Sequence, residues 1–583
     1  MRGDEWLSRL PPGPRPNVVL VVYDARRRDD FSFGPHGNSR GDTRFLAAFE
    51  RESASFLDAV SPGCWTVPVH ASMFSGLSVC DLGNDLFFRD WATFPNHFLS
   101  LAEILTLAGY RTVAFPDHPF FYGVSASHGG EMAYSLLRGF QLFSVVNDFG
   151  RFGVRTNVGT ENGKVEVTHT LAGPPASTTE VAAEVASFNS GRLRMDPARE
   201  GDLDGVRQVH LARLDALFAS SPYLHKRYLE PFDRRVFESG AGQPYFLFLN
   251  LHMATHVALP EPALYARWCA RTLMLNATAK GLRLPEVSEP LAEWVVRTYG
   301  QLGLRHDGFP DPGLFLKQAF DNRFYDACFE GVWKYLEGRG LTSNTLTIVT
   351  SDHGMSFGDK GERFYRHDGA RPYEYITRVP LLVRFPSGSE LATLHRRYEE
   401  RVSLTDVFST ILDVALGAGV FERNLPIRGR SLVSRIREND FDPVQVTETA
   451  AAPDGYASEP QAAGHTKAVY WRRYKLILMP DPWRVVDRDW PTNVPLDASL
   501  PGRAGARVNP RLGREVAWLY DLAADPHERN DLAPAHPDTV AAMKRLVGDR
   551  WSCRPLGPSP SRRPPDEWDP EALETLRALG YIR

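Results

Sequence analysis

Residues 18–24 read VVLVVYD, a run of apolar and mostly β-branched side chains that stops abruptly at Asp24. An unbroken apolar run of this length is typical of a strand buried on both faces, as in a parallel sheet covered by helices. A second run of this kind, LTIVTS at residues 346–351, ends in Asp352 and His353. Ligands bind at the carboxyl ends of strands in α/β sheets, so both runs predict one shared site. Carboxylates and an imidazole that converge in this way suit a divalent cation.

The segment between the two strands that carries the most chemistry is WTVPVHASMFSG at residues 65–76. Thr66 stands two residues before Pro68, at the mouth of an apolar helix, and is a candidate nucleophile. A threonine hydroxyl needs a metal ion for activation, and a helix N-terminus stabilises an anion formed there. The alternative is that Thr66 serves only as the helix N-cap, since Thr-x-Pro is also a common helix start.

Strand and helix patterns alternate along the chain and favour an α/β fold. An amphipathic stretch at 98–108 stops at Gly109 and is followed by a strand-like run at 110–115. Another helix pattern, at about 317–337, leads into the strand that ends at Asp352. This order predicts a three-layer α/β/α sandwich with a large mixed sheet.

The length of the chain and a change in its sequence pattern near residue 450 predict more than one domain. At 583 residues it exceeds the ~250–300 residues at which single cores stop growing. We expect a catalytic α/β domain over residues 1–450, with an insertion at about 147–240 and a second loop-rich stretch at about 258–312. Two short strand patterns joined at residues 472–473 predict a hairpin. They indicate a smaller C-terminal α+β domain over residues 455–583.

Composition and charge exclude several classes of protein. Hydrophobic residues make up 43% and charged residues 24% of the chain, and the formal net charge is -4, as in an ordinary globular protein. No basic surplus predicts nucleic acid as a partner. The apolar run at 18–23 is far shorter than the ~20 residues that a membrane span needs. Arg26, Arg27 and Arg28 are followed by two acids, which predicts a solvated turn.

The N-terminus and the cysteines favour a cytoplasmic location. No basic segment followed by an apolar core, the pattern of a secretory signal, is readable at the start of the chain. The five cysteines are scattered without the paired spacing of metal sites, and we expect them to be reduced. An exported or N-terminally truncated protein is the alternative.

Taken in order, the motifs resemble the sulfatase branch of the alkaline phosphatase superfamily. That family has a strand ending in Asp, a helix start of the pattern Cys/Ser/Thr-x-Pro-x-Arg/His, and a late strand ending in Asp-His/Asn-Gly. Further matches are PYFLFLN at 244–250 running into His256, His367 ahead of residues 373–374, and LYDL at 519–522. The resemblance spans nearly the whole chain. It implies a sulfatase-like fold and a metal-dependent ester hydrolase or transferase.

The resemblance also implies roles for three histidines. In two-metal relatives, a pair spaced like His252 and His256, together with a later histidine such as His367, holds a second metal ion. In one-metal relatives, His256 and His367 instead contact the substrate oxyanion or the leaving group. The alternative for each is an ordinary core or surface histidine. The implied metal ligands are Asp24, Thr66, Asp352, His353, His252, His256 and His367, and the implied catalytic residues are Thr66, His256 and His367.

Two departures from the family pattern bear on the activity. Sulfatases that resemble this chain carry, at the position of Thr66, a Cys or Ser that is oxidised to formylglycine. Oxidation of a threonine would give a ketone, and threonine is the nucleophile of phosphodiesterase and pyrophosphatase relatives. The family's usual Arg is His70 here. We therefore expect cleavage of a phosphoryl-type ester; the alternatives are a sulfuric ester hydrolase that does not use formylglycine and a non-catalytic binding member.

The ligand types favour zinc or manganese, as one or two ions, over calcium or magnesium, which prefer oxygen-only sites. The expected substrate is a small-molecule anionic ester, and neither nucleic acid nor a membrane is expected as a partner. The sequence leaves open the oligomeric state and the choice between hydrolysis and transfer.

Overall fold

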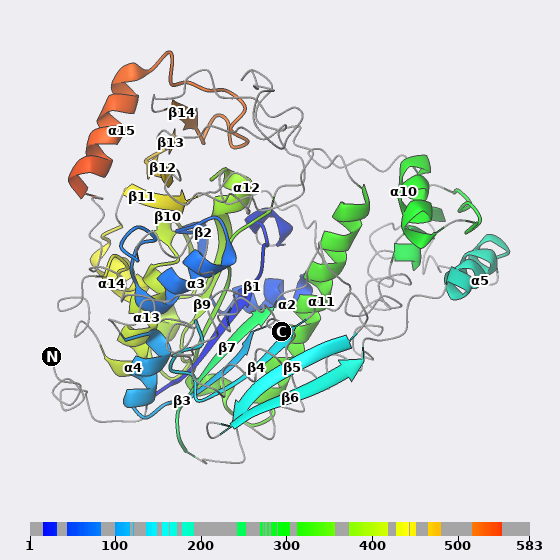
Figure 1. The fold of residues 1–583 in the computed structure, drawn as a ribbon, viewed down its shortest axis with the longest axis horizontal. Helices are drawn as coiled ribbons and strands as arrows, with labels where there is room; N and C mark the ends of the chain where they lie inside the picture. Colours follow the sequence, from blue (N-terminus) through cyan, green and yellow to red (C-terminus); the bar gives the residue numbers. More distant parts are fainter. Residues whose placement is uncertain are drawn as a thin grey trace, which may run out of the picture.

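The structure is a computed structural model, and two sheets form its framework (Figure 1). The larger sheet has 10 strands and the smaller has 4. The residues that it describes are 15–31, 43–82, 99–116, 121, 136–147, 154–161, 164–171, 178–191, 242–251, most of 269–302, 312–355, 372–417, 427–441, 444–450, 465–479 and 516–550.

The larger sheet is mixed and has β1 among its central strands, in the order β10-β2-β9-β8-β1-β7-β3-β4-β5-β6. β1 pairs in parallel with both β7 and β8, so the carboxyl ends of these three strands meet at one edge. Only β9 and β5 run against the other strands. The strands are β1 (Asn17–Tyr23), β2 (Ala54–Val60), β3 (Arg111–Pro116), β4 (Leu142–Asn147), β5 (Val154–Glu161), β6 (Lys164–Leu171), β7 (Tyr245–Leu251), β8 (Thr345–Ser351), β9 (Arg378–Arg384) and β10 (Arg397–Ser403).

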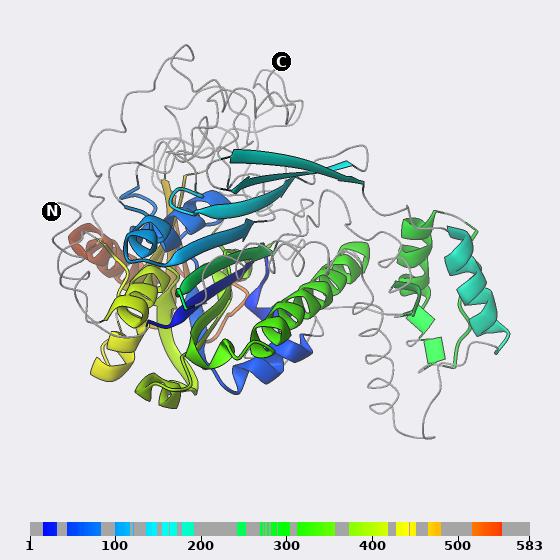
Figure 2. The ribbon, with the colours of Figure 1, turned by 90° about the horizontal axis from the view of Figure 1, so that it is seen from below.

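Helices cover both faces of this sheet, which confirms the predicted three-layer α/β/α architecture (Figure 2). Side chains of β1 alternate between two hydrophobic clusters: Val18 and Leu20 face one, whereas Val19 and Val21 face the other. The apolar character of β1 on both faces follows from this double burial. The first layer contains α3 (Thr66–Ser75), α4 (Leu101–Leu107), α13 (Asp406–Leu416) and α14 (Leu432–Glu438), and the second contains α2 (Arg44–Glu50) and α11 (Pro312–Glu337). Short helical turns are η1 (Arg28–Asp30), η7 (Thr342–Asn344), α12 (Glu374–Thr377) and η8 (Glu390–Leu394).

The smaller sheet is antiparallel, and α15 (Pro537–Arg550) packs on it through Met543 and Val547. Its strands are β11 (Val444–Ala450), β12 (His465–Trp471), β13 (Tyr474–Met479) and β14 (Val516–Asp521). The predicted hairpin joined at residues 472–473 is present as β12 and β13, with Arg472 at a φ of 55° in the turn. The sheet takes its first strand from residues 444–450, ahead of the boundary predicted at residue 455.

The described residues of the stretch predicted as an insertion lie in two different places. The β5–β6 hairpin continues the larger sheet beyond β4. α5 (Thr178–Asn189) lies away from the sheet beside α10 (Leu291–Gln301) in both ribbon views (Figures 1 and 2). The expectation that residues 258–312 are loop-rich is wrong for α10, whose buried Trp294 packs in the same hydrophobic cluster as Val181.

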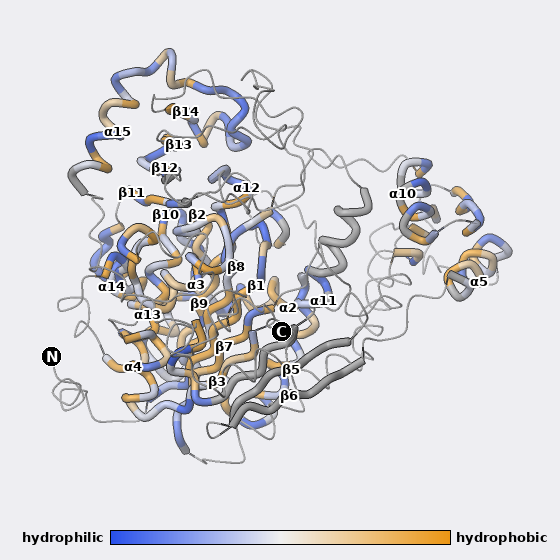
Figure 3. Tube along the Cα trace, in the orientation of Figure 1, coloured by the Kyte–Doolittle hydropathy of each residue, from blue (hydrophilic) through white to orange (hydrophobic). Residues whose placement is uncertain are grey.

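Hydrophobic segments are concentrated in the central strands of the larger sheet (Figure 3). No helix within the described ranges combines the length and the apolar character needed to cross a membrane. The expectation of reduced cysteines holds for Cys64, Cys269 and Cys328, which are buried thiols outside any disulfide. It is wrong for Cys80, which is disulfide-bonded.

Candidate metal centre and nucleophile

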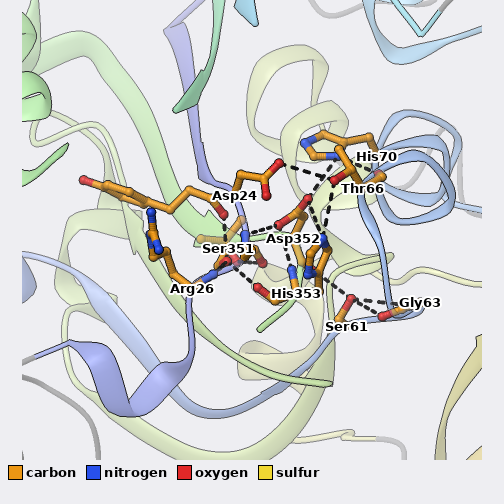
Figure 4. Close-up of polar contacts among 12 residues, drawn as sticks. Asp24, Arg26, Ser61, Gly63, Thr66, His70, Ser351, Asp352 and His353 are labelled. Atoms are coloured by element: carbon orange, nitrogen blue, oxygen red, sulfur yellow. Dashed lines mark hydrogen bonds and ion pairs between the residues drawn. The ribbon is translucent and has the colours of Figure 1, made fainter. Parts of the chain in front are cut away.

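Three buried side chains meet where β1 and β8 end. Asp24 follows β1, Asp352 and His353 follow β8, and the parallel register pairs the last residues of the two strands, Tyr23 and Ser351. One possible ligand atom from each side chain lies within 4.8 Å of the other two. The structure thus brings together the three residues that the strand patterns selected (Figure 4).

Thr66 is the first residue of α3, and its hydroxyl faces this cluster. Thr66 Oγ1 donates a hydrogen bond to Asp24 Oδ2 at 3.3 Å and lies 3.4 Å from His353 Nε2. The N-cap position belongs to Trp65, whose side chain makes no capping hydrogen bond. The Thr66 hydroxyl therefore lies beside the candidate ligands. The alternative prediction, that Thr66 is the N-cap of α3, is wrong, because Trp65 holds that position.

The tautomer of His353 follows from its backbone contact. His353 Nδ1 lies 2.8 Å from the carbonyl oxygen of Gly354. Since a carbonyl oxygen only accepts, Nδ1 carries a hydrogen, so in the neutral ring the lone pair is on Nε2. Nε2 faces Thr66 Oγ1 and also lies 3.4 Å from Asp352 Oδ2. The contact of Nδ1 fixes the orientation of the ring, so that Nε2 faces the other candidate ligands.

The carboxyl group of Asp352 supports a cation site most directly. Its Oδ1 accepts hydrogen bonds from the backbone N–H groups of Ala25 and His353, at 3.0 and 2.8 Å. Its Oδ2 is buried and has no hydrogen-bond partner among the residues that the structure describes. Burial and the nearby Asp24 raise the pKa of Asp352 to about 7, although His353 and the two N–H groups oppose that rise. A buried carboxylate oxygen with this surplus of negative charge fits a divalent cation.

The backbone at Ala25 and the side chain of Ser61 hold the cluster in place. Ala25, directly after Asp24, has a φ of 55°, an uncommon conformation for a residue with a side chain. This conformation accompanies the hydrogen bond from its N–H to Asp352. Ser61 donates from Oγ to the carbonyl oxygen of Asp352 at 2.5 Å. No sequence motif identifies Ser61, because its role depends on a contact between segments far apart in the chain.

His70 occupies the family's Arg position, but its imidazole is neutral at pH 7. Burial lowers the pKa of His70 to about 4, although its hydrogen bond to the backbone of Thr66 opposes that shift. The bond joins Nδ1 to the carbonyl oxygen of Thr66 at 2.8 Å, and the ring packs edge-on against Phe121 and Phe248. His70 therefore supports the first turn of α3 and supplies no permanent positive charge.

The expectation of a solvated basic turn after Asp24 is wrong. Arg26, Arg27 and Arg28 are 0%, 2% and 7% exposed. Arg26 lies over the ring of Tyr325, and Arg27 Nε donates to the carbonyl oxygen of Met355 at 2.6 Å. The local charge pattern misleads here, because these side chains are buried by segments that lie far along the chain.

The three histidines implied by the family resemblance lie outside the described residues. They are His252, His256 and His367. Their roles as ligands of a second metal ion or as catalytic groups stay predictions.

The fold is a three-layer α/β/α sandwich, and its candidate site holds two carboxylates and one imidazole beside a buried hydroxyl. The Sulfatase family model matches residues 16–418, more than half of the chain. The chain belongs to the sulfatase family, as its motifs indicated.

Individual sulfatases align with part of the chain. Arylsulfatase K from Gallus gallus is 25% identical over 226 residues, which cover 38% of this chain and 34% of that protein. Steryl-sulfatase from Rattus norvegicus is 28% identical over 238 residues, covering 38% of each chain. The alignments thus span only 34% to 38% of the length of these curated relatives.

Solved structures match over most of the chain. A Bacteroides thetaiotaomicron protein from a genetic locus for the metabolism of multiple glycosaminoglycans gives a TM-score of 0.54 at 15% identity, covering 92% of this chain and 97% of that one. The phosphonate monoester hydrolase of Agrobacterium radiobacter gives 0.51 at 16% identity, covering 92% and 95%. At these identities the likeness establishes the fold alone.

Proposed function

We propose that this sulfatase-family protein cleaves a small anionic phosphoryl-type ester with Thr66 as its nucleophile. The observation that carries the proposal is the position of Thr66 Oγ1, which lies 3.3 Å from Asp24 Oδ2 and 3.4 Å from His353 Nε2. A buried hydroxyl among candidate ligands at the start of a helix is suited to nucleophilic attack.

In this proposal Asp24, Asp352 and His353 hold one divalent cation, zinc or manganese by ligand type. Such an ion supplies positive charge that lowers the pKa of a neighbouring hydroxyl and offsets charge in the transition state. The protein's own contribution is to fix Thr66 and to orient the His353 ring, with Nδ1 towards the Gly354 carbonyl oxygen and Nε2 towards Thr66. His256 and His367 are proposed to contact the leaving group or a second ion.

The proposed reaction has two displacements at phosphorus. Thr66 Oγ forms a bond to phosphorus, while the bond to the leaving oxygen breaks and its electron pair departs with that oxygen. The proton lost from Thr66 is balanced by the proton gained by the departing alcohol. Water then attacks the phosphothreonine, releases phosphate or a phosphate monoester, and returns the hydroxyl of Thr66. An alcohol in place of water would give transfer.

Hydrolysis of a sulfate ester is the second candidate, since the relatives matched along the sequence are named as sulfatases. Residue 66 decides between the two in our proposal, because a threonine cannot yield the aldehyde of formylglycine. Turnover of matched aryl phosphodiester, phosphomonoester, phosphonate and sulfate esters should be highest on a phosphorus compound. Preference for the sulfate ester by protein with an unmodified Thr66 would overturn this choice.

The nucleophile is tested by substitution at residue 66. Thr66→Ala should lower kcat by several orders of magnitude, as loss of a nucleophile does. Thr66→Ser keeps the hydroxyl and should retain much of the activity. Both variants should still bind Mn²⁺ or Zn²⁺ through Asp24, Asp352 and His353 and should give the parent circular dichroism spectrum. An active Thr66→Ala variant would mean that the hydroxyl does not attack the substrate.

A further inference from the structure

A fully buried lysine of the smaller sheet lies between two acids from other segments. Lys475 Nζ, on β13, is 2.9 Å from Glu374 Oε1 and 2.8 Å from Glu528 Oε1. The lysine side chain has no exposed surface, and that of Glu528 is 1% exposed. Burial would lower the pKa of Lys475, but the two carboxylates outweigh burial and raise this pKa. The lysine therefore stays charged and holds both acids.

The two acids meet at the start of α12, a helix of only four residues. Glu374 is the first residue of α12, and its backbone N–H donates to Glu528 Oε2 at 2.8 Å. Thr377, the last residue of α12, lies 3.4 Å from Lys475 Nζ through its Oγ1. A helix this short does not stabilise itself, so its position depends on such anchors. Lys475 thus contacts side chains at both ends of α12.

The middle of α12 packs directly against the residue after the candidate ligand pair. The backbone N–H of Gly354 donates to the carbonyl oxygen of Ile376 at 2.6 Å. A Cβ atom on Gly354 would overlap the carbonyl oxygen of Tyr375, so the two backbones are in close contact. The centre of the Tyr375 ring also lies 5.2 Å from the guanidinium of Arg27. The same guanidinium donates a hydrogen bond to the carbonyl oxygen of Met355. Hence α12 fixes the backbone that follows His353.

We propose that Lys475 is a positioning residue for the Asp352–His353 pair, acting through α12 from the smaller sheet. The sequence of contacts runs from Lys475 to Glu374, through α12 to Gly354, and from the Gly354 carbonyl to His353 Nδ1. The proposal rests on the proposed function, because it takes Asp352 and His353 as cation ligands. It gives the smaller sheet a part in the site although none of the three candidate ligands lies in that sheet.

The test needs a variant that folds without the lysine. Lys475→Met alone leaves two buried carboxylates facing each other and is expected to be strongly destabilised. The triple variant Lys475→Met, Glu374→Gln, Glu528→Gln removes the three charges together and avoids that penalty, while Arg378, which also pairs with Glu374, keeps its ion pair with Asp58. Arg473→Gln is the matched control, since it breaks an ion pair with Asp521 at the same hairpin. Circular dichroism must show the parent spectrum for each protein compared.

Two measurements separate positioning from general stability. In metal-free protein, hydrogen–deuterium exchange of the peptide covering residues 352–355 should be faster in the triple variant and unchanged in Arg473→Gln. The affinity for Mn²⁺, measured by calorimetry, should fall by about tenfold or more in the triple variant, as when a contact that orients a metal ligand is lost. Parent-like exchange or parent-like Mn²⁺ affinity in the folded triple variant would overturn the proposal. Absence of Mn²⁺ and Zn²⁺ binding by the parent protein would instead overturn the cation site, and the exchange measurement would still decide the role of Lys475.

Discussion

At the scale of single residues, Gly354 shows how little room surrounds the candidate metal centre. Its backbone carbonyl oxygen lies at His353 Nδ1 and fixes the tautomer of that ring. Its backbone N–H donates a hydrogen bond to the carbonyl oxygen of Ile376 in α12. Any side chain at this position would meet the carbonyl oxygen of Tyr375. The glycine in the Asp-His-Gly motif is therefore explained by close backbone packing and not by an unusual φ.

Gly354→Ala should displace α12 or the backbone beside His353. We expect a loss of about 1–3 kcal/mol in the free energy of unfolding, as for overpacking, together with weaker Mn²⁺ binding. Urea unfolding and calorimetry measure the two effects. Gly388→Ala is the control, because a Cβ there meets no atom within 4 Å. Equal behaviour of the two variants would contradict the steric account.

The residues of the site differ in how far sequence predicts them. Asp24 and Asp352 were predictable because each ends an apolar run, and parallel strands place such ends together. Ser61 and Lys475 were not, because serine and lysine are common at surfaces and their roles arise only from contacts made in the folded chain. The buried Arg26 was mistaken for a solvated residue for the same reason.

At the scale of elements, α4 shows the strongest local signal for a helix start. Ser100 Oγ accepts from the N–H of Glu103 at 3.1 Å, and Glu103 Oε2 accepts from the N–H of Ser100 at 2.7 Å. These reciprocal bonds form a capping box. Ser100 also donates to the carbonyl oxygen of Arg138 at 2.8 Å, which ties the helix start to a neighbouring segment.

Ser100→Ala should lower the free energy of unfolding by about 1 kcal/mol, because it removes the cap. Denaturant unfolding followed by circular dichroism measures the change. Ser190→Ala is suited as a control, since Ser190 is exposed and follows the end of α5. A change of the same size in both variants would show that the capping box contributes nothing specific.

Elements in or beside the central sheet were predicted from their patterns, whereas those of the two inserted stretches were not. β1 and the β12–β13 hairpin lie where the apolar runs and the turn at 472–473 placed them. α10 has an amphipathic sequence that the loop-rich interpretation of residues 258–312 overlooked, and its Trp294 packs in one hydrophobic cluster with Val181 of α5. The edge position of the β5–β6 hairpin likewise depends on pairing with β4, which no local pattern encodes.

At the scale of the whole molecule, buried ion pairs join the two sheets and make stability depend on pH. Burial by itself would raise the pKa of Glu374, but Arg378 and Lys475 outweigh it and hold this pKa well below its ordinary value of 4.5. As the pH falls below 4.5, the unfolded chain therefore takes up a proton at Glu374 before the folded protein does.

The stability supplied by Glu374 should be present above pH 4.5 and lost progressively below it. We expect this carboxyl to account for a loss on the order of 2 kcal/mol as the pH falls. Urea unfolding between pH 6 and pH 3 should give a shallower pH dependence for Glu374→Gln than for the parent protein. Glu399→Gln, at an exposed position of β10, should leave the slope unchanged. Identical slopes for all three proteins would argue against the ion-pair account.

The pairing of β1 has a consequence for biosynthesis. Val18 pairs with Phe246 on one side and with Leu346 on the other. β1 is therefore synthesised long before β7 and β8, the two strands that it pairs with. During that interval the run VVLVVY is an apolar, unpaired segment of a nascent chain, the kind of segment that aggregates or recruits chaperones. Ribosome-bound chains arrested before residue 345 should accordingly be captured by such chaperones through residues 18–23. Chains arrested with residue 400 outside the exit tunnel should largely escape them, because translation has by then supplied both neighbours of β1.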